Sequence, residues 1–425
     1  AGECQLQNYY MEHDRQESRL EVGKIHDRKK TIFGPNVVFD GERCIKCTRC
    51  VRFCQEITKT HELAVVNRGD HSTIALFDDA VLDNPLSANV VDICPVGALT
   101  DRDFRFKVRV WYLDKTPSIC PGCSTGCNIS VEAYQNKIAR FKPRQNEAVN
   151  SHWICDEGRY CFHDLAGGER LTTPLIRQEG GVLVPTTWET ALQAVVNGLR
   201  GAQPLAGILS GRNTNEEAYL FAKLIPKLAN DCAMEVFYQE RQLSEVQKLL
   251  MSPDRSPNFR GARDMGVSSS RGFAGLVQEL VGNHFSSAFI VGEDLLGANG
   301  NSAEIRSALE KLSFLVVQDT KRTATAELAH VVLPAAHFGE KEGTYTNRKG
   351  RVQKLNAAVI CPEGARQDSE IFLSLLDGAG QALDYATPSD IFTALTQEVP
   401  TYKGLTYDTI GAQGFELGSG GGAAS

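Results

Sequence analysis

Two sets of four cysteines are the residues of this sequence whose types and spacing can do chemistry. In the first set, Cys44, Cys47 and Cys50 lie close together and Cys94 follows at a distance. The second set reads C-x2-C-x3-C with one later cysteine, and its members are Cys120, Cys123, Cys127 and Cys155. Four-iron clusters are held by four cysteine thiolates. Each set offers three thiolates from one tight turn and a fourth from a distant segment. The sequence therefore predicts two [4Fe-4S] clusters and electron transfer.

Cys54 complicates the first set, because it completes the run C-x2-C-x2-C-x3-C. In two-cluster ferredoxins the fourth cysteine of that run ligates the other cluster. That interpretation requires a second full run near Cys94, and residues 84–104 contain no other cysteine. We therefore expect Cys54 to be a packed thiol that binds no metal, and Cys94 to be the fourth ligand.

The second set has glycines at positions 122 and 126, where the backbone of a cluster-binding turn must approach inorganic sulfide. Four cysteines can also hold structural zinc, although zinc motifs usually consist of two matched C-x2-C pairs. A zinc scaffold without redox activity therefore stays open as an alternative.

Four basic residues thread the first turn, and their charge should favour the reduced, more negative cluster. They are Arg43, Lys46, Arg49 and Arg52. Three further cysteines have no His or Cys neighbour at ligand spacing, so we expect them to be buried as small hydrophobes. They are Cys161, Cys232 and Cys361.

The composition fits a large redox protein of a reducing compartment. The chain has 425 residues, a net charge of −7 and 13 cysteines, enough for several domains with ordinary cores. Eleven of these cysteines lie in the first 161 residues, many at metal-ligand spacing, which indicates metal binding and not a disulfide framework. We find no apolar run long enough to span a membrane and no leader peptide. The acidic balance argues against nucleic acid as a ligand.

The elements that must position the cysteines differ between the two halves of the chain. Up to about residue 168 we expect short strands and turns, and beyond it helices alternate with strands. Capping boxes at Thr186–Glu189 and Thr214–Glu217 each begin a helix. The predicted strands cover residues 205–209, 288–292 and 314–317, and the predicted helices end near Gly201, Asn230 and Leu312. This alternation predicts a doubly wound, mostly parallel α/β sheet. No G-x-G-x-x-G follows a strand, so we expect no nicotinamide or flavin site.

These motifs resemble the G subunit of bacterial respiratory complex I, the NADH:quinone oxidoreductase. The stretch G-E-R-C-I-K-C-T-R-C-V-R-F from Gly41, closed by C-P-V-G-A-L from Cys94, resembles a four-cysteine cluster site of that family. The second set resembles an extra cluster of many bacterial versions, also found in molybdopterin formate dehydrogenases. The stretches from Asp319 to Ala336 and from Glu342 to Gln353 are similar to the molybdopterin oxidoreductase superfamily. The resemblance covers nearly the whole chain.

Cys4 resembles the last ligand of the family's cluster site with one histidine and three cysteines, H-x3-C-x2-C-x5-C. The other ligands and the family's ferredoxin-like beginning do not appear in this sequence. We expect them on a missing N-terminal segment or on a separate polypeptide, where they would share a third [4Fe-4S] cluster. His13 and His26 follow Cys4, whereas the family's histidine precedes its cysteines, so we expect neither to be a ligand.

The resemblance implies small ferredoxin-like and β-rich iron–sulfur domains followed by a molybdopterin-oxidoreductase-like α/β domain. The expected parts are a cluster-segment remnant at 1–33, a first [4Fe-4S] domain at 34–110, a second at 111–168, an α/β scaffold at 169–410 and a flexible tail at 411–425. We expect no molybdopterin, because no cysteine beyond Cys155 has the context of a molybdenum ligand. Cys232, for example, is followed by Ala-Met-Glu and not by histidine.

The function that the resemblance implies is electron relay from a flavin subunit towards quinone in the peripheral arm of the complex. The first cluster would lie on the main path and the second would be peripheral, with no bond-making residue. The expected partners are the flavin subunit and other iron–sulfur subunits. The expected location is the cytoplasm, at the inner face of the cell membrane through the complex. A wiring or catalytic subunit of a formate dehydrogenase or of an NAD-linked hydrogenase is the alternative.

Overall fold

The computed structural model describes residues 2–15, 17, 21, 23, 26–78, 80–298 and 302–418. Its chain divides into two compact units, and neither is continuous in sequence. Unit 1 comprises Ala1–Thr116, Ile129–Tyr160 and Gln242–Met251, and unit 2 comprises Pro117–Asn128, Cys161–Arg241 and Ser252–Ser425. The chain leaves unit 1 within β6 (Asp114–Ile119) and returns to it within β7 (Asn128–Tyr134). The turn that carries Cys120, Cys123 and Cys127 therefore belongs to unit 2.

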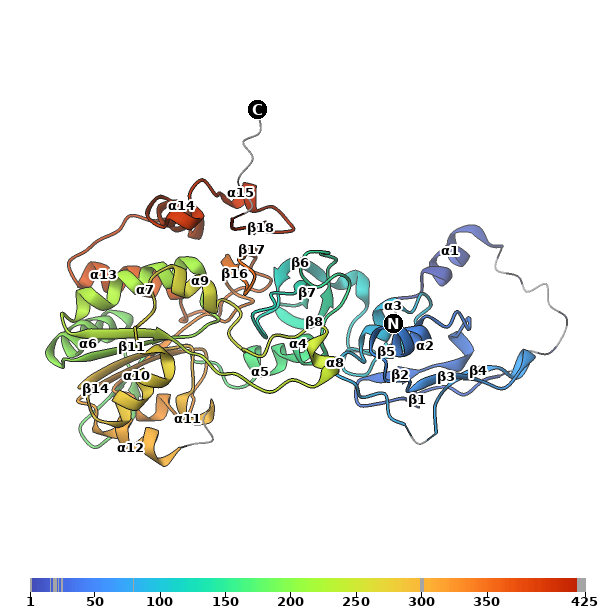
Figure 1. The fold of residues 1–425 in the computed structure, drawn as a ribbon, viewed down its shortest axis with the longest axis horizontal. Coiled ribbons are helices and arrows are strands. Elements are labelled where there is room, and N and C mark those ends of the chain that lie inside the picture. The colour runs from blue at the N-terminus through green and yellow to red at the C-terminus, as the bar shows by residue number, and fades with distance from the viewer. Residues whose placement is uncertain are drawn as a thin grey trace. The chain divides into compact units, whose positions relative to one another are not determined.

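Short antiparallel strands and short helices build unit 1, which is coloured blue to green in Figure 1 except for the yellow segment with α8. One sheet has the order β1-β2-β5, and β3 pairs with β4 as a hairpin. Strand β7 pairs with β8. The other strands are β1 (Thr31–Ile32), β2 (Val37–Phe39), β3 (Leu63–Val66), β4 (Thr73–Leu76), β5 (Leu99–Asp101) and β8 (Lys137–Pro143).

The helices of unit 1 flank the cysteines of the first set. Helix α2 (Arg49–Arg52) contains Cys50 and continues into a π-helical turn, η2 (Phe53–Ile57), and α3 (Asn89–Ile93) ends at Cys94. The remaining helices and turns are α1 (Gln5–His13), η1 (Gly41–Arg43), η3 (Gly69–His71), η4 (Val110–Tyr112), α4 (Asp156–Tyr160) and α8 (Glu245–Lys248). Buried strand β2 pairs with β5, and β5 contacts α3.

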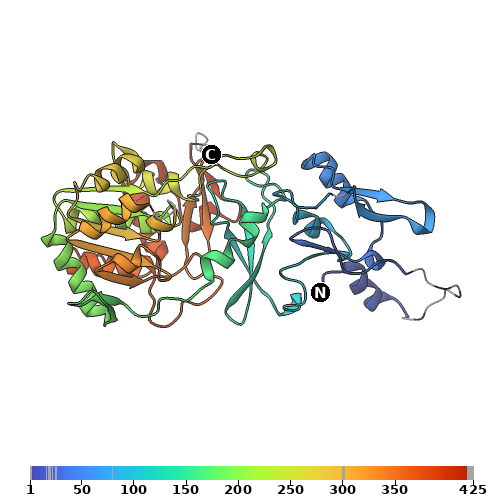
Figure 2. The ribbon, with the colours of Figure 1, turned by 90° about the horizontal axis from the view of Figure 1, so that it is seen from below.

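A seven-stranded sheet of order β10-β9-β15-β14-β13-β11-β12 forms the centre of unit 2. The strands from β11 to β15 are parallel and lie side by side in Figure 2, and β9 and β10 add an antiparallel edge. Their bounds are β9 (Leu175–Arg177), β10 (Leu183–Pro185), β11 (Leu205–Leu209), β12 (Cys232–Val236), β13 (Ser287–Val291), β14 (Phe314–Asp319) and β15 (Val331–Pro334). A separate sheet joins β16 (Gly343–Thr346), β17 (Arg351–Leu355) and β18 (Phe415–Glu416).

Helices cover both faces of the large sheet, so the predicted doubly wound, mostly parallel α/β fold is confirmed. Alternate side chains of β11 divide between two cores: Leu205 and Leu209 pack with α6, α7 and α13, whereas Ala206 and Ile208 pack with α10 and α12. The helices are α5 (Phe162–Ala166), α6 (Trp188–Gly201), α7 (Asn215–Leu228), α9 (Phe259–Asp264), α10 (Gly272–Val281), α11 (Leu295–Ala298), α12 (Ala303–Lys311), α13 (Asp368–Gly378), α14 (Pro388–Glu398) and α15 (Tyr407–Ile410). Two 3-10 turns are η5 (Ala326–Leu328) and η6 (Pro400–Tyr402).

Two helix starts show how local chemistry sets the boundaries. The capping box at Thr214 is confirmed, because its Oγ1 accepts from the Glu217 N–H and the Glu217 carboxylate accepts from the Thr214 N–H. The box expected at Thr186 is wrong by one residue. Thr186 donates its N–H to the Pro174 carbonyl instead, and Thr187 caps α6.

Ordered structure in unit 2 continues to Phe415–Glu416, beyond residue 410, where the sequence predicted that the scaffold ends. Strand β18 pairs with β17, and the Leu417 N–H donates to the Gly350 carbonyl, in a stretch expected to belong to a flexible tail. Residues 419–425 of that tail lie outside the described residues. Among the described helices, none has the length and apolar character needed to cross a membrane.

Candidate iron–sulfur sites

The four cysteines of the first set line one cavity in unit 1, together with apolar side chains of β2 and β5. Cys44 follows the turn η1, Cys50 lies in α2 and Cys94 follows α3, so three separate elements position them. The loop between them is tightly coiled, with positive φ angles of 57° at Lys46 and 60° at Thr48. Its Lys46 N–H donates to the Cys44 Sγ at 3.3 Å. The predicted ligands of the first cluster are thus brought together.

The cavity is small, about 20 Å³, and burial disfavours the thiolate form of its cysteines. Burial raises the pKa of Cys50 to about 12, and the neighbouring Cys44, Cys94 and Cys47 act in the same direction. Burial also raises the pKa of Cys44. Four thiolates packed this closely repel one another, so they require a cationic centre among them. Iron supplies that charge in a four-iron cluster, and N–H donors to sulfur stabilise the cluster further.

The four cysteines share the wall of this cavity without converging on one point. In the described parts of the chain, no three His, Cys, Asp or Glu side chains are grouped closely enough to hold a single metal ion. A cluster binds each cysteine to a different iron and therefore keeps the sulfurs farther apart than one zinc ion does.

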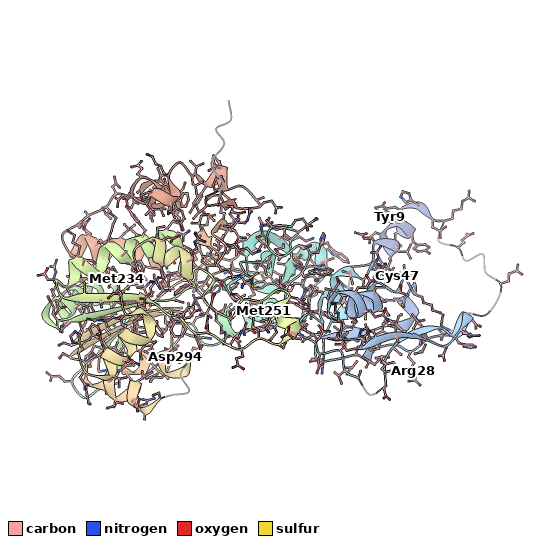
Figure 3. The ribbon with its side chains drawn as sticks, in the orientation of Figure 1. Tyr9, Arg28, Cys47, Met234, Met251 and Asp294 are labelled. Carbon is pink, nitrogen blue, oxygen red and sulfur yellow. The ribbon has the colours of Figure 1, made fainter. Side chains whose placement is uncertain are left out.

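The first set is close to solvent on one side. Cys47 is exposed and is labelled at the surface of unit 1 in Figure 3, whereas Cys50 is buried. Two of the four basic residues are engaged in ion pairs: Arg52 with Glu56 at 3.0 Å and Arg43 with its acidic neighbour Asp40 at 3.5 Å. Exposed pairs of this kind are screened by water and salt, so their effect on a cluster is smaller than their number suggests.

Cys54 does not line the cavity. Its side chain is fully buried, and burial raises its pKa, with the nearby Glu62 carboxylate and its hydrogen bond to the thiol adding to the effect. Cys54 therefore lies beside a carboxylate, with which it forms a hydrogen bond, and not among the thiols that line the cavity. The geometry therefore agrees with a packed thiol, which remains a prediction until the variant is measured.

Cys4 lies at the start of α1 in unit 1, where its carbonyl accepts from the Gln7 and Asn8 N–H groups. The preceding Glu3 is anchored by an ion pair of 2.6 Å with Arg140, and Arg140 also binds Glu132 at 2.7 Å. Both histidines near the N-terminus pair with carboxylates: His26 with Glu42 at 2.7 Å and His13 with Glu12 at 3.5 Å.

Three cysteines of the second set lie buried in one turn of unit 2. The turn is closed by two backbone hydrogen bonds, from Cys120 to the Cys127 carbonyl at 2.8 Å and from Gly126 to the Cys123 carbonyl at 3.3 Å. Gly126 has a φ of +69°, and a Cβ there would lie 2.6 Å from the Gln353 side-chain oxygen. The close approach expected at Gly126 therefore exists, but a protein side chain makes it.

Cys155 lies in unit 1, at the start of α4, and its buried Sγ accepts from the Gly158 N–H at 3.2 Å. Cys161, in unit 2, is not the isolated buried thiol that the sequence suggested. It is half-buried and forms a hydrogen bond with Cys120. This hydrogen bond is the largest cause, and burial the next, that raises the pKa of Cys120 well above its usual range. Cys232 and Cys361 are also half-buried. Sequence spacing could not reveal the Cys161 contact, because it depends on the fold of unit 2.

Sequence reasoning also missed a polar cavity of about 670 Å³ in unit 2. It lies at the carboxyl ends of β11, β13, β14 and β15, where open parallel sheets generally bind ligands. Acidic and basic side chains line it, including Arg212, Glu293, Asp319 and Lys341. Asp294, which also lines it, is labelled in Figure 3. Burial raises the pKa of Asp319 to about 6, with Glu293 and Asp294 acting in the same direction.

Three family models match the chain in succession. They are "NADH-quinone oxidoreductase subunit 3, ferredoxin-like domain" at residues 34–100, "Molybdopterin oxidoreductase Fe4S4 domain" at 113–166, and "Molybdopterin oxidoreductase" at 170–258 and 254–377. A curated relative, the NADH-quinone oxidoreductase G subunit of Streptomyces coelicolor, is 37% identical over 224 residues, which cover 52% of this chain and 27% of the relative. The second of the NADH-quinone oxidoreductase G subunits of Rhizobium meliloti is 25% identical over 97% of this chain and 71% of its own length. The chain resembles the G subunit of NADH-quinone oxidoreductase.

The resemblance to the G subunit agrees with the two cysteine sets. All four cysteines of the first set fall within the ferredoxin-like match, and all four of the second fall within the Fe4S4 match, so the comparisons support iron–sulfur clusters. The match to the S. coelicolor G subunit spans only about a quarter of that protein. Among solved structures, acetylene hydratase from Pelobacter acetylenicus aligns with a TM-score of 0.48 at 10% identity, covering 71% of this chain and 74% of its own.

Proposed function

We propose that the chain is an iron–sulfur electron-transfer subunit of the peripheral arm of a complex I type NADH:quinone oxidoreductase. It would relay electrons from a flavin subunit towards quinone. The observation that carries this proposal is the cavity of unit 1, whose wall contains Cys44, Cys47, Cys50 and Cys94, inside the span that matches the ferredoxin-like domain of subunit 3. The resemblance to the G subunit supports the choice of complex.

In this proposal the first set holds a [4Fe-4S] cluster on the main path, and the second set holds a more peripheral one. The ligands of the second are Cys120, Cys123, Cys127 and Cys155. A bound cluster takes up and gives back one electron. The protein holds the sulfurs in place, excludes water from Cys50, and directs backbone N–H groups such as that of Lys46 at sulfur. The exposed Cys47 gives the first cluster an edge close to solvent, where electrons can enter or leave.

The partners in this proposal are the flavin subunit and neighbouring iron–sulfur subunits, which would hold the chain at the inner face of the membrane. Cys4 would be the last ligand of a third cluster shared with residues not in this sequence. The polar cavity of unit 2 would hold no molybdopterin. No cysteine is among the described residues that line it, and Lys341 is tied by two contacts of 2.8 Å to Glu217 and Asp368.

The test is the iron, sulfide, zinc and molybdenum content of the anaerobically purified chain, with low-temperature EPR of the reduced protein. We expect about eight irons per chain and two distinguishable four-iron signals. Molybdenum near one per chain would favour a formate dehydrogenase relative instead. A colourless protein that contains zinc would refute the electron-transfer proposal.

A further inference from the structure

The hairpin β16–β17 of unit 2 forms hydrogen bonds with the turn that carries Cys120, Cys123 and Cys127. Gln353, in β17, donates its side-chain N–H groups to the Gly126 carbonyl at 2.9 Å and to the Asn128 Oδ1 at 2.7 Å. Gln353 is only 1% exposed and Asn128 is equally buried. The contact is therefore made without water.

The same hairpin satisfies the two carbonyls before Gly126. The Asn347 Nδ2 donates to the Thr125 carbonyl at 3.2 Å, and the Arg348 N–H donates to the Ser124 carbonyl at 3.0 Å. Asn347 is itself fixed, since its Oδ1 accepts the N–H groups of residues 349 and 351, each at 3.0 Å. Three successive carbonyls of the turn are thus directed at one rigid hairpin.

The direction of these carbonyls matters for a cluster. Reduction adds negative charge, which a nearby carbonyl oxygen opposes and an amide N–H stabilises. Carbonyls tied to the hairpin cannot rotate towards the sulfurs. A buried carbonyl that loses its donor is destabilised, which favours reorientation of the peptide or entry of water.

We propose that Gln353 and Asn347 are positioning residues of the second cluster, and that the β16–β17 hairpin gives the α/β unit a direct role in setting that cluster's potential. This inference rests on the proposed function, because it requires a cluster on the second cysteine set. It assigns unit 2 a task that requires no ligand in its polar cavity.

The test uses two isosteric variants of the full chain, Gln353→Glu and Asn347→Asp, each of which replaces an amide donor by a carboxyl group. Thr344→Val is the matched control, since Thr344 lies on the same hairpin but its Oγ1 bonds only to α7, at Asn215 and Glu216. Redox titration followed by EPR reports each cluster separately. We expect Gln353→Glu to shift the second cluster to a more negative potential or to abolish its signal, with the first cluster and the Thr344→Val protein unchanged.

Three results would overturn the inference. If Gln353→Glu leaves the potential and the iron content of the second cluster as in the parent, the residue does not position it. If Thr344→Val loses the second cluster equally, the effect is general unfolding of unit 2. If the parent protein itself shows no second cluster, the proposed function fails at this site and the inference fails with it.

Discussion

Replacing Cys94 by serine should remove one cluster and leave the other. Cys94 lines the cavity of unit 1 with the three cysteines of the 44–50 turn, and each cysteine would hold a different iron. Loss of one thiolate therefore releases the whole first cluster. Iron and sulfide should each fall from about eight to about four per chain. The EPR signal of the second cluster should persist.

Cys54→Ser is the matched control, because Cys54 lies on the helical segment that continues from Cys50 but not on the cavity wall. Its side chain is fully buried and hydrogen-bonds with Glu62. A serine hydroxyl can donate to the same carboxylate, so the change in the free energy of unfolding should stay within about 1 kcal/mol. Iron and sulfide analysis, reduced EPR spectra and thermal unfolding should be measured on both variants. Equal loss of iron from the two would refute the ligand assignment.

Three further predictions concern unit 2. Burial raises the pKa of Glu216 to about 7, so the folded state keeps a proton that the unfolded chain releases near pH 4.5. The free energy of unfolding should therefore fall by up to about 3 kcal/mol as the pH rises between these values. Urea titrations should show a flatter dependence of this free energy on pH in Glu216→Gln, but not in the exposed control Glu304→Gln. Lys341→Met leaves two carboxylates buried without their cation and should lower the free energy of unfolding, measured by thermal unfolding, by about 3–5 kcal/mol. Lys223→Met removes a more exposed ion pair and should lower it by about 0–1 kcal/mol, and equal losses would contradict the buried network. Gly126→Ala places a methyl group 2.6 Å from a buried oxygen at a positive φ, so EPR should show loss of the second cluster only, and an intact signal would show that the turn can relax.

Local sequence chemistry was sufficient for the elements that depend on neighbours in sequence. The β11 strand was predicted at Leu205–Leu209 because its five residues are apolar, and α7 because Thr214 and Glu217 form a capping box. The start of α6 was missed by one residue. The Thr186 N–H instead donates to the Pro174 carbonyl beside the β9–β10 hairpin. A rule that considers only neighbours in sequence cannot predict this bond.

The grouping of the first cysteine set was predictable, since three ligands lie in one turn and the fourth carries a Cys-Pro signature. The neighbourhood of the second set was not. Gln353 touches the turn from more than 200 residues away, and no spacing rule links it to Gly126. The polar cavity was missed for a similar reason, because its charged residues follow four different strands that meet only in the folded sheet. Strand ends such as Glu293 and Asp319 were the available signal.

The separation of 227 residues between Gln353 and Gly126 has a consequence for biosynthesis. A ribosome adds roughly 5–20 residues per second, so the Cys120–Cys127 turn would wait about 10–45 s for the hairpin that anchors it. During that interval the turn that carries these thiols lacks its hydrogen bonds to the hairpin. Iron delivered before the hairpin emerges would meet an unanchored turn, whereas the Cys44–Cys94 set closes within the first hundred residues. The two cysteine sets should therefore assemble one after the other, with the second set dependent on emergence of the β16–β17 hairpin.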